Sequence, residues 1–127
     1  MKKSIIVVLA ILSLIVLGWF LQNRELHNLF LMADSKLKSI SALIYNDEYT
    51  KAEDTFDLYN KEWQKTEKKL CLVISHEDID FITRCNGQLR AYLSAYGKEE
   101  ALGVIAELYA TYHELDRKFR VNFKTIF

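Results

Sequence analysis

The sequence predicts an all-α protein: an N-terminal transmembrane helix followed by an antiparallel four-helix domain of two helical hairpins. Three observations support this fold class. The chain opens with two lysines and a long apolar run, four later windows repeat apolar residues at intervals of three and four, and none of the 127 residues is proline. Intervals of three and four line one face of a helix, whereas strands alternate with a period of two.

The apolar run covers residues 5–21, and only Ser13 and Gly18 lower its hydrophobicity. At about 1.5 Å per residue it is roughly 25 Å long, the short end of what crosses a bilayer. We therefore expect residues 1–22 to form a transmembrane anchor and residues 23–127 to form the helical domain.

The charges beside the run predict its orientation. Lys2 and Lys3 precede it, and Arg24, with an acidic neighbour, follows it. Because positive charge stays inside, the N-terminus is expected in the cytoplasm and the domain outside a cell membrane that the chain crosses once. Trp19 and Phe20 then fall at the outer edge, where aromatic side chains favour the headgroup layer.

A cleaved signal peptide is the main alternative, since lysines before an apolar run fit it as well. The run is long for that purpose, and Val16-Leu17-Gly18 is the nearest approach to an A-x-A-like cleavage site. A buried helix of a soluble protein is the third interpretation. We favour the retained anchor.

Each of the four windows predicts one helix with a narrow apolar face, so the four must pack together. In chain order, the apolar positions are Leu26, Phe30, Ala33, Leu37, Ile40 and Ile44; Tyr49, Ala52, Phe56, Tyr59, Trp63 and Leu70; Ile79, Ile82, Leu89, Leu93 and Tyr96; and Ala101, Ile105, Leu108, Tyr112, Leu115 and Phe119. Thr66 and Asn86 occupy the same faces in the second and third windows.

Capping residues separate these windows. We expect Asp47 to cap the N-terminus of the second helix, and Ser75 to cap the third in a capping box with Asp78. Gly97 is expected to end the third helix as a left-handed residue, and residues 98–100 open the fourth. Connections of two to five residues make successive helices antiparallel neighbours.

The two hairpins resemble each other, because Ala52 and Ala101 each put a small residue early in a second helix. Ala52 and Phe56 match part of the tetratricopeptide signature, while its other positions differ, so a tetratricopeptide-like stack and a bundle both remain open. No helix breaker lies between Leu21 and Leu26. We therefore expect the membrane helix to continue into the domain and to hold it at the membrane surface.

Composition argues against several functions. The chain has 17 basic and 17 acidic residues, whereas nucleic-acid binding needs a basic surplus. It has no P-loop, dinucleotide fingerprint, G-x-S-x-G, H-E-x-x-H or paired-cysteine motif. We expect no enzyme activity, no cofactor and no nucleic-acid partner.

The densest polar cluster begins at His76. His76 and Asp80 are four residues apart on one helix face, a spacing that can hold a metal. The pair is incomplete unless His27 or His113 converges on it from another helix. Acidic residues in a first helical turn also stabilise the helix by their charge, and we favour that interpretation.

Two cysteines and an aromatic stripe have structural interpretations. Antiparallel packing offsets Cys71 from Cys85 by roughly 8 Å along the helix axis, which argues against a disulfide and for buried thiols. The stripe in the second helix is expected to be core, and a groove for a peptide or an apolar ligand is its alternative. Its members are Tyr49, Phe56, Tyr59 and Trp63.

The C-terminal residues 117–127 contain four basic residues and no acid. Helical spacing puts Phe119, Phe123 and Phe127 on one face, with Lys124 among the cations. These four residues are the candidate interaction site. The segment can dock on anionic lipid, dock on a partner, or fold back on its own core.

The sequence resembles an uncharacterised family of short, N-terminally membrane-anchored helical proteins from Gram-positive spore-forming bacteria. Residues 46–82 carry the resemblance, notably Asp47-Glu48-Tyr49 and Ser75-His76-Glu77-Asp78-Ile79-Asp80, with a second match at residues 98–108. The resemblance implies an anchored helical domain, and it brings no activity, ligand or catalytic residue.

We expect the domain to be a protein-interaction module for an envelope or membrane protein. A ligand- or peptide-binding protein with an aromatic groove is the first alternative, and a metal-dependent enzyme using His76 and nearby carboxylates is the second. The sequence leaves the partner, the process and the oligomeric state open.

Overall fold

The structure is a computed structural model that describes residues 1–70 and 74–126, without the side chains of residues 22, 23 and 119–126. It consists of four helices: α1 (Lys2–Tyr45), α2 (Tyr49–Leu70), α3 (His76–Ser94) and α4 (Lys98–Ile126). The part of the chain that the structure describes contains no strand. The predicted all-α class is confirmed.

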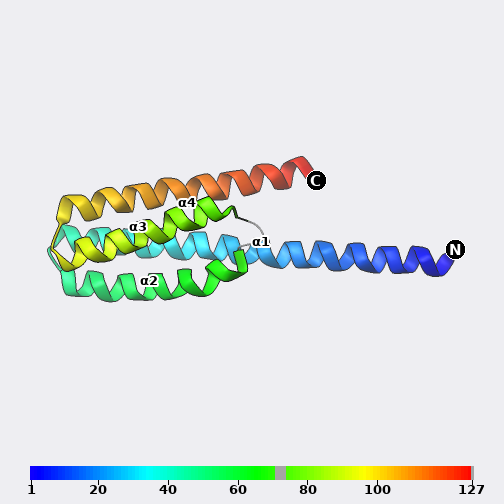
Figure 1. Cartoon of the computed structure of the whole chain (residues 1–127), viewed down its shortest axis with the longest axis horizontal. Helices are drawn as coiled ribbons and strands as arrows, with labels where there is room; N and C mark the ends of the chain where they lie inside the picture. The colour runs from blue at the N-terminus through cyan, green and yellow to red at the C-terminus, as the bar shows by residue number, and fades with distance from the viewer. Residues whose placement is uncertain (71–73, 127) are drawn as a thin grey trace.

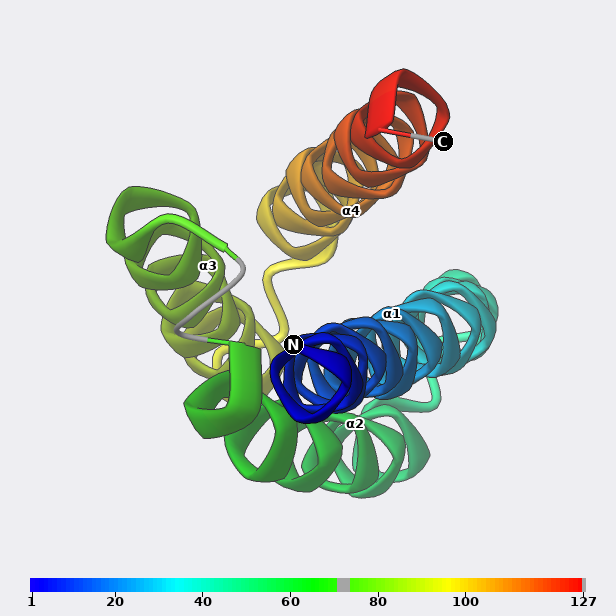
Figure 2. The same cartoon turned by 90° about the vertical axis from the view of Figure 1, so that its right-hand side faces the viewer.

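The helices form an antiparallel bundle (Figure 1). Each helix packs against its neighbours in sequence, and α4 packs against α1, which closes the ring (Figure 2). In a tetratricopeptide-like stack, α1 would pack on α3 instead, because equivalent helices of successive repeats adjoin. The two-hairpin domain is therefore a four-helix bundle.

One continuous helix, α1, joins the apolar run to the bundle. It has 44 residues and passes without a break from Leu21 to Leu26, as the sequence predicts. Its N-terminal part is apolar and exposed, and it is long and apolar enough to cross a membrane. From Leu26 onward its apolar face lies inside the bundle.

The apolar positions of the predicted core stripes are buried, with two exceptions among the side chains that the structure describes. Tyr49 is half-buried, and Tyr96 is 70% exposed because α3 ends at Ser94. Ala52 and Ala101 are fully buried, as expected of small residues where helices approach closely. The aromatic stripe of α2 mainly fills the core, as expected, because Phe56, Tyr59 and Trp63 are all buried.

Both tight turns differ from the prediction by one residue. The left-handed residues are Asp47 and Tyr96, each with a φ of 57°. The Glu48 N–H donates to the Leu43 carbonyl at 2.8 Å, and the Gly97 N–H donates to the Tyr92 carbonyl at 2.9 Å; both are Schellman bonds.

The sequence prediction was therefore wrong on two points at these turns. Asp47 ends α1 and does not cap α2, and the left-handed position after α3 belongs to Tyr96 rather than to Gly97. The carbonyl groups in the last turn of the preceding helix accept the Schellman bonds, and they thereby determine which residue takes the left-handed conformation. This requirement outweighs the preference of glycine for that conformation.

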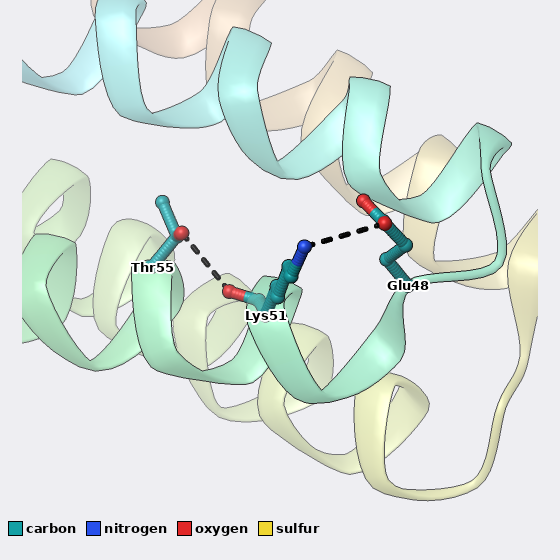
Figure 3. A network of polar contacts seen from close by, with 3 residues as sticks. All are labelled: Glu48, Lys51 and Thr55. Atoms are coloured by element: carbon teal, nitrogen blue, oxygen red, sulfur yellow. Dashed lines mark hydrogen bonds and ion pairs between the residues drawn. The ribbon is translucent and has the colours of Figure 1, made fainter.

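The beginnings of α2 and α3 are held by local polar contacts. Ser75 caps α3 as predicted, because its Oγ accepts from the Asp78 N–H at 3.3 Å and donates to Asp78 Oδ2 at 2.9 Å. At α2, Lys51 Nζ lies 3.4 Å from Glu48 Oε1, and Thr55 Oγ1 donates to the Lys51 carbonyl at 3.0 Å (Figure 3). These exposed contacts are worth little individually.

Candidate functional site

A groove of about 190 Å³ lies between α1 and α4, where the ring of the bundle closes. The residues that line it come from the first domain turns of α1 and from the middle of α4. They are His27, Phe30, Leu31, Asp34, Leu37, Tyr109, Tyr112, His113 and Asp116. Since position 27 is six residues beyond Leu21, the groove starts about 9 Å from the end of the apolar run.

The floor of the groove is apolar and aromatic. Phe30 and Tyr112 meet edge to face with ring centroids 6.1 Å apart, and Tyr112 is only 4% exposed. Leu31, in contrast, is 58% exposed on the rim. An exposed leucine beside a buried aromatic floor suits an apolar side chain from another molecule.

The rim is polar and partly ordered by Tyr109. Its hydroxyl donates to the Asp34 carbonyl oxygen at 3.2 Å, and its ring stacks on His113 with centroids 6.4 Å apart. Burial raises the pKa of the Tyr109 hydroxyl, and the nearby charge of Asp34 raises it further. The tyrosine is therefore a neutral hydrogen-bond donor that links α4 to α1.

A buried polar network lies beneath the floor. The Tyr59 and Tyr112 hydroxyl oxygens are 2.7 Å apart, and Tyr59 donates to Asn86 Oδ1 at 2.8 Å. Tyr112 is then the donor to Tyr59. Burial raises the pKa of both tyrosines well above 10, so both are neutral donors. Three helices are thereby joined through hydrogen bonds in the core.

The candidate interaction residues fall outside what the structure describes in atomic detail. The backbone of α4 is helical to Ile126, but the side chains of Phe119, Phe123 and Lys124 lie outside the described part, as does Phe127 altogether. Their proposed roles stay predictions.

The weak metal candidates stay apart from the other histidines. His76 and Asp80 are exposed near the start of α3, whereas His27 and His113 line the groove between α1 and α4. Among the described residues, no group of three histidine, cysteine, aspartate or glutamate side chains is arranged to hold a metal ion.

Cys85 is a free, buried thiol, and Cys71 lies outside the described residues. The Cys85 Sγ donates to Glu107 Oε2 at 3.9 Å. Burial raises the pKa of this thiol, and the neighbouring Glu107 carboxylate raises it further. A thiol held in its neutral form is a poor nucleophile.

Sequence reasoning missed the groove as a site. Leu31 and Tyr109 lie beside the core stripes and not on them, so periodicity treats them as surface residues. The spacing of Tyr109 and His113 by four positions is a signal of a shared face, but only the packing of α4 on α1 brings that face to His27 and Leu31.

The fold defines the class of protein as a four-helix bundle whose first helix carries an apolar N-terminal extension. The chain belongs to the family of the domain of unknown function DUF4363, whose model matches residues 20–126. This confirms the predicted membership of an uncharacterised family. No curated protein and no solved structure matches the chain.

Proposed function

We propose that this protein is a single-pass membrane protein whose extracytoplasmic bundle binds an envelope or membrane protein through the groove between α1 and α4. It acts as a non-catalytic interaction module. The observation that carries the proposal is the continuity of α1, whose exposed apolar half runs without a break into the half that lines the groove.

Continuity restricts the partner. A bundle on a rigid helix cannot search far from the lipid, and the groove spans positions 27–37 of α1, roughly 9–24 Å beyond Leu21. A partner that reaches this height is itself membrane-bound or lies flat on the membrane. The apolar floor and open rim suit a helix that inserts one large apolar side chain.

Crosslinking in intact cells tests the groove. A photoreactive residue replaces Leu31, which is 58% exposed in the groove, and Leu58 on α2, which is 54% exposed outside it, serves as the matched control. We expect position 31 to capture one discrete membrane or envelope protein that position 58 does not capture. Equal capture at both positions, or capture of lipid alone at position 31, contradicts the proposal.

Protease added to intact spheroplasts tests the anchor and its orientation. We expect digestion of the bundle, protection of a tag before Lys2, and retention of the undigested chain in washed membranes. A shortened, soluble species would instead indicate a cleaved signal peptide, and a protected bundle would indicate the opposite orientation.

A further inference from the structure

The end of α4 extends beyond the rest of the bundle toward the apolar half of α1 (Figure 1). α4 has 29 residues, compared with 22 in α2 and 19 in α3. α2 ends at Leu70, and Lys69 Nζ lies 3.3 Å from Glu25 Oε1. Beyond the level of Glu25, the described backbone therefore consists of α1 and α4.

Contacts between α1 and α4 fix the height of this extension. The Tyr109 hydroxyl bonds to the carbonyl of Asp34, and Tyr112 contacts Phe30 one turn nearer the apolar run. Because antiparallel helices rise equally per residue, position 119 lies about level with position 24, and position 126 about level with position 17.

That height is the end of the apolar run. Positions 17–24 of α1 include Trp19 and Phe20, the aromatic residues expected at the headgroup layer. The last two turns of α4 therefore reach the depth at which α1 enters the hydrocarbon. Figure 2 shows the C-terminal end of the α4 backbone set apart from the α1 backbone.

The composition of the extension suits that depth. After Asp116 the chain has no acidic residue, and its cations are Arg117, Lys118, Arg120 and Lys124. Its large apolar residues are Phe119, Phe123, Ile126 and Phe127. A helix with aromatic and basic residues binds the boundary between anionic headgroups and acyl chains.

We infer that residues 119–126 of α4 form a second membrane contact, which docks in the headgroup layer of anionic lipid beside α1. This contact rests on the proposed membrane anchor and goes beyond it. It holds the bundle to the membrane at two points and fixes the direction in which the groove between α1 and α4 opens.

Depth-dependent quenching of tryptophan by brominated lipid tests the contact in the full chain reconstituted into phosphatidylcholine vesicles containing phosphatidylglycerol. Trp19 is replaced by Phe, which leaves buried Trp63 as a constant background. We expect the added Phe123→Trp indole to be quenched by lipids brominated near the headgroup. The matched variant, Leu58→Trp, lies about 20 Å higher and should keep its emission.

Anionic lipid is the second variable in this experiment. Each cation near an anionic surface contributes binding free energy, so Arg120→Gln with Lys124→Gln should weaken docking about 30-fold. The phosphatidylglycerol fraction needed for half-maximal quenching should rise accordingly. If the quenching depends neither on the phosphatidylglycerol fraction nor on these two substitutions, the electrostatic part of the inference is wrong.

Quenching of Trp19 in the unsubstituted protein distinguishes a failure of the proposed membrane anchor from a failure of the second membrane contact. If Trp19 of the parent is quenched but the F123W indole is not, the anchor stands and the second contact is wrong, and the tail is then free to bind a protein. If Trp19 is not quenched either, the anchor itself is wrong.

Discussion

Tyr59 is the residue on which the polar network in the core depends. Its hydroxyl accepts from Tyr112 on α4 and donates to Asn86 on α3, and all three side chains are buried. Asn86 Nδ2 is the only buried side-chain nitrogen or oxygen in the described part of the chain that has no hydrogen-bond partner. The network therefore already contains one unpaired donor, and the loss of either hydroxyl leaves further polar groups unpaired.

Tyr59→Phe should lower the free energy of unfolding by about 1–3 kcal/mol, because Asn86 Oδ1 and the Tyr112 hydroxyl then stay buried without partners. Denaturant unfolding of the full chain in detergent micelles measures this. Tyr45→Phe is the control, since Tyr45 is exposed and should change stability by less than about 0.5 kcal/mol. Equal stabilities for the two variants would show that the network contributes nothing.

At the residue scale the sequence predicted which side chains are buried, but it did not predict which of them form hydrogen bonds with one another. Periodicity placed Tyr59, Asn86 and Tyr112 on core-facing stripes, and all three are buried. Their hydroxyls and amide meet at one height only because α2, α3 and α4 pack in a particular register. That register depends on the volumes of many side chains together, and no local pattern encodes it.

At the scale of the helix, the two hairpin turns are alike although their sequences differ. Each has a Schellman end with a left-handed residue that is not glycine. For an L residue this conformation costs roughly 1–2 kcal/mol, less for aspartate than for tyrosine. The bundle keeps both strained turns because the helices on either side are buried.

Asp47→Gly should therefore raise the free energy of unfolding by about 0.5–1 kcal/mol, because glycine adopts the left-handed conformation without strain. Thermal or denaturant unfolding measures the change. The same substitution at Asp54, an exposed position inside α2, should lower stability by about 0.5 kcal/mol. A loss of stability at Asp47 would contradict the assigned role of this residue.

Helix existence was predictable here, and the exact ends were less so. Ser75 carries its own capping signal, because the hydroxyl and the Asp78 amide are three residues apart in every such turn. The ends of α1 and α3 depend instead on hydrogen bonds to carbonyl groups in the preceding turn. For this reason the left-handed residues are Asp47, which the sequence predicts as an N-cap, and Tyr96, where the sequence predicts Gly97.

At the scale of the whole molecule, closure of α4 on α1 makes both the bundle and the groove. The same closure buries Tyr112 against Tyr59, so the stability of the bundle is linked to the ionisation of core tyrosines. Burial raises the pKa of both above 10, which means that the folded protein holds their protons more tightly than the unfolded chain does.

Stability should consequently fall at alkaline pH. The stability contributed by the buried tyrosines is complete below their pKa in the unfolded chain, near 10, and is lost as pH rises toward their pKa in the folded protein. The decline begins near pH 9, because the Cys85 thiol ionises there in the unfolded chain and has a raised pKa in the folded protein. Denaturant unfolding at pH 9, 10 and 11 measures the decline. Between pH 10 and 11 the parent should lose about 1 kcal/mol more than Tyr59→Phe. Identical losses would show that Tyr59 ionises normally in the folded protein.

Apolar periodicity and the composition of the first residues were enough to predict a membrane-compatible helix, four domain helices and nearly every core position, because burial on one face leaves a local signature in the chain. The groove and the height of the C-terminal turns arise from the packing of α4 on α1, and the tyrosine–asparagine network arises from the register in which α2, α3 and α4 pack. Residues such as Leu31 and Tyr109 are more than seventy positions apart, and only three-dimensional packing makes them neighbours.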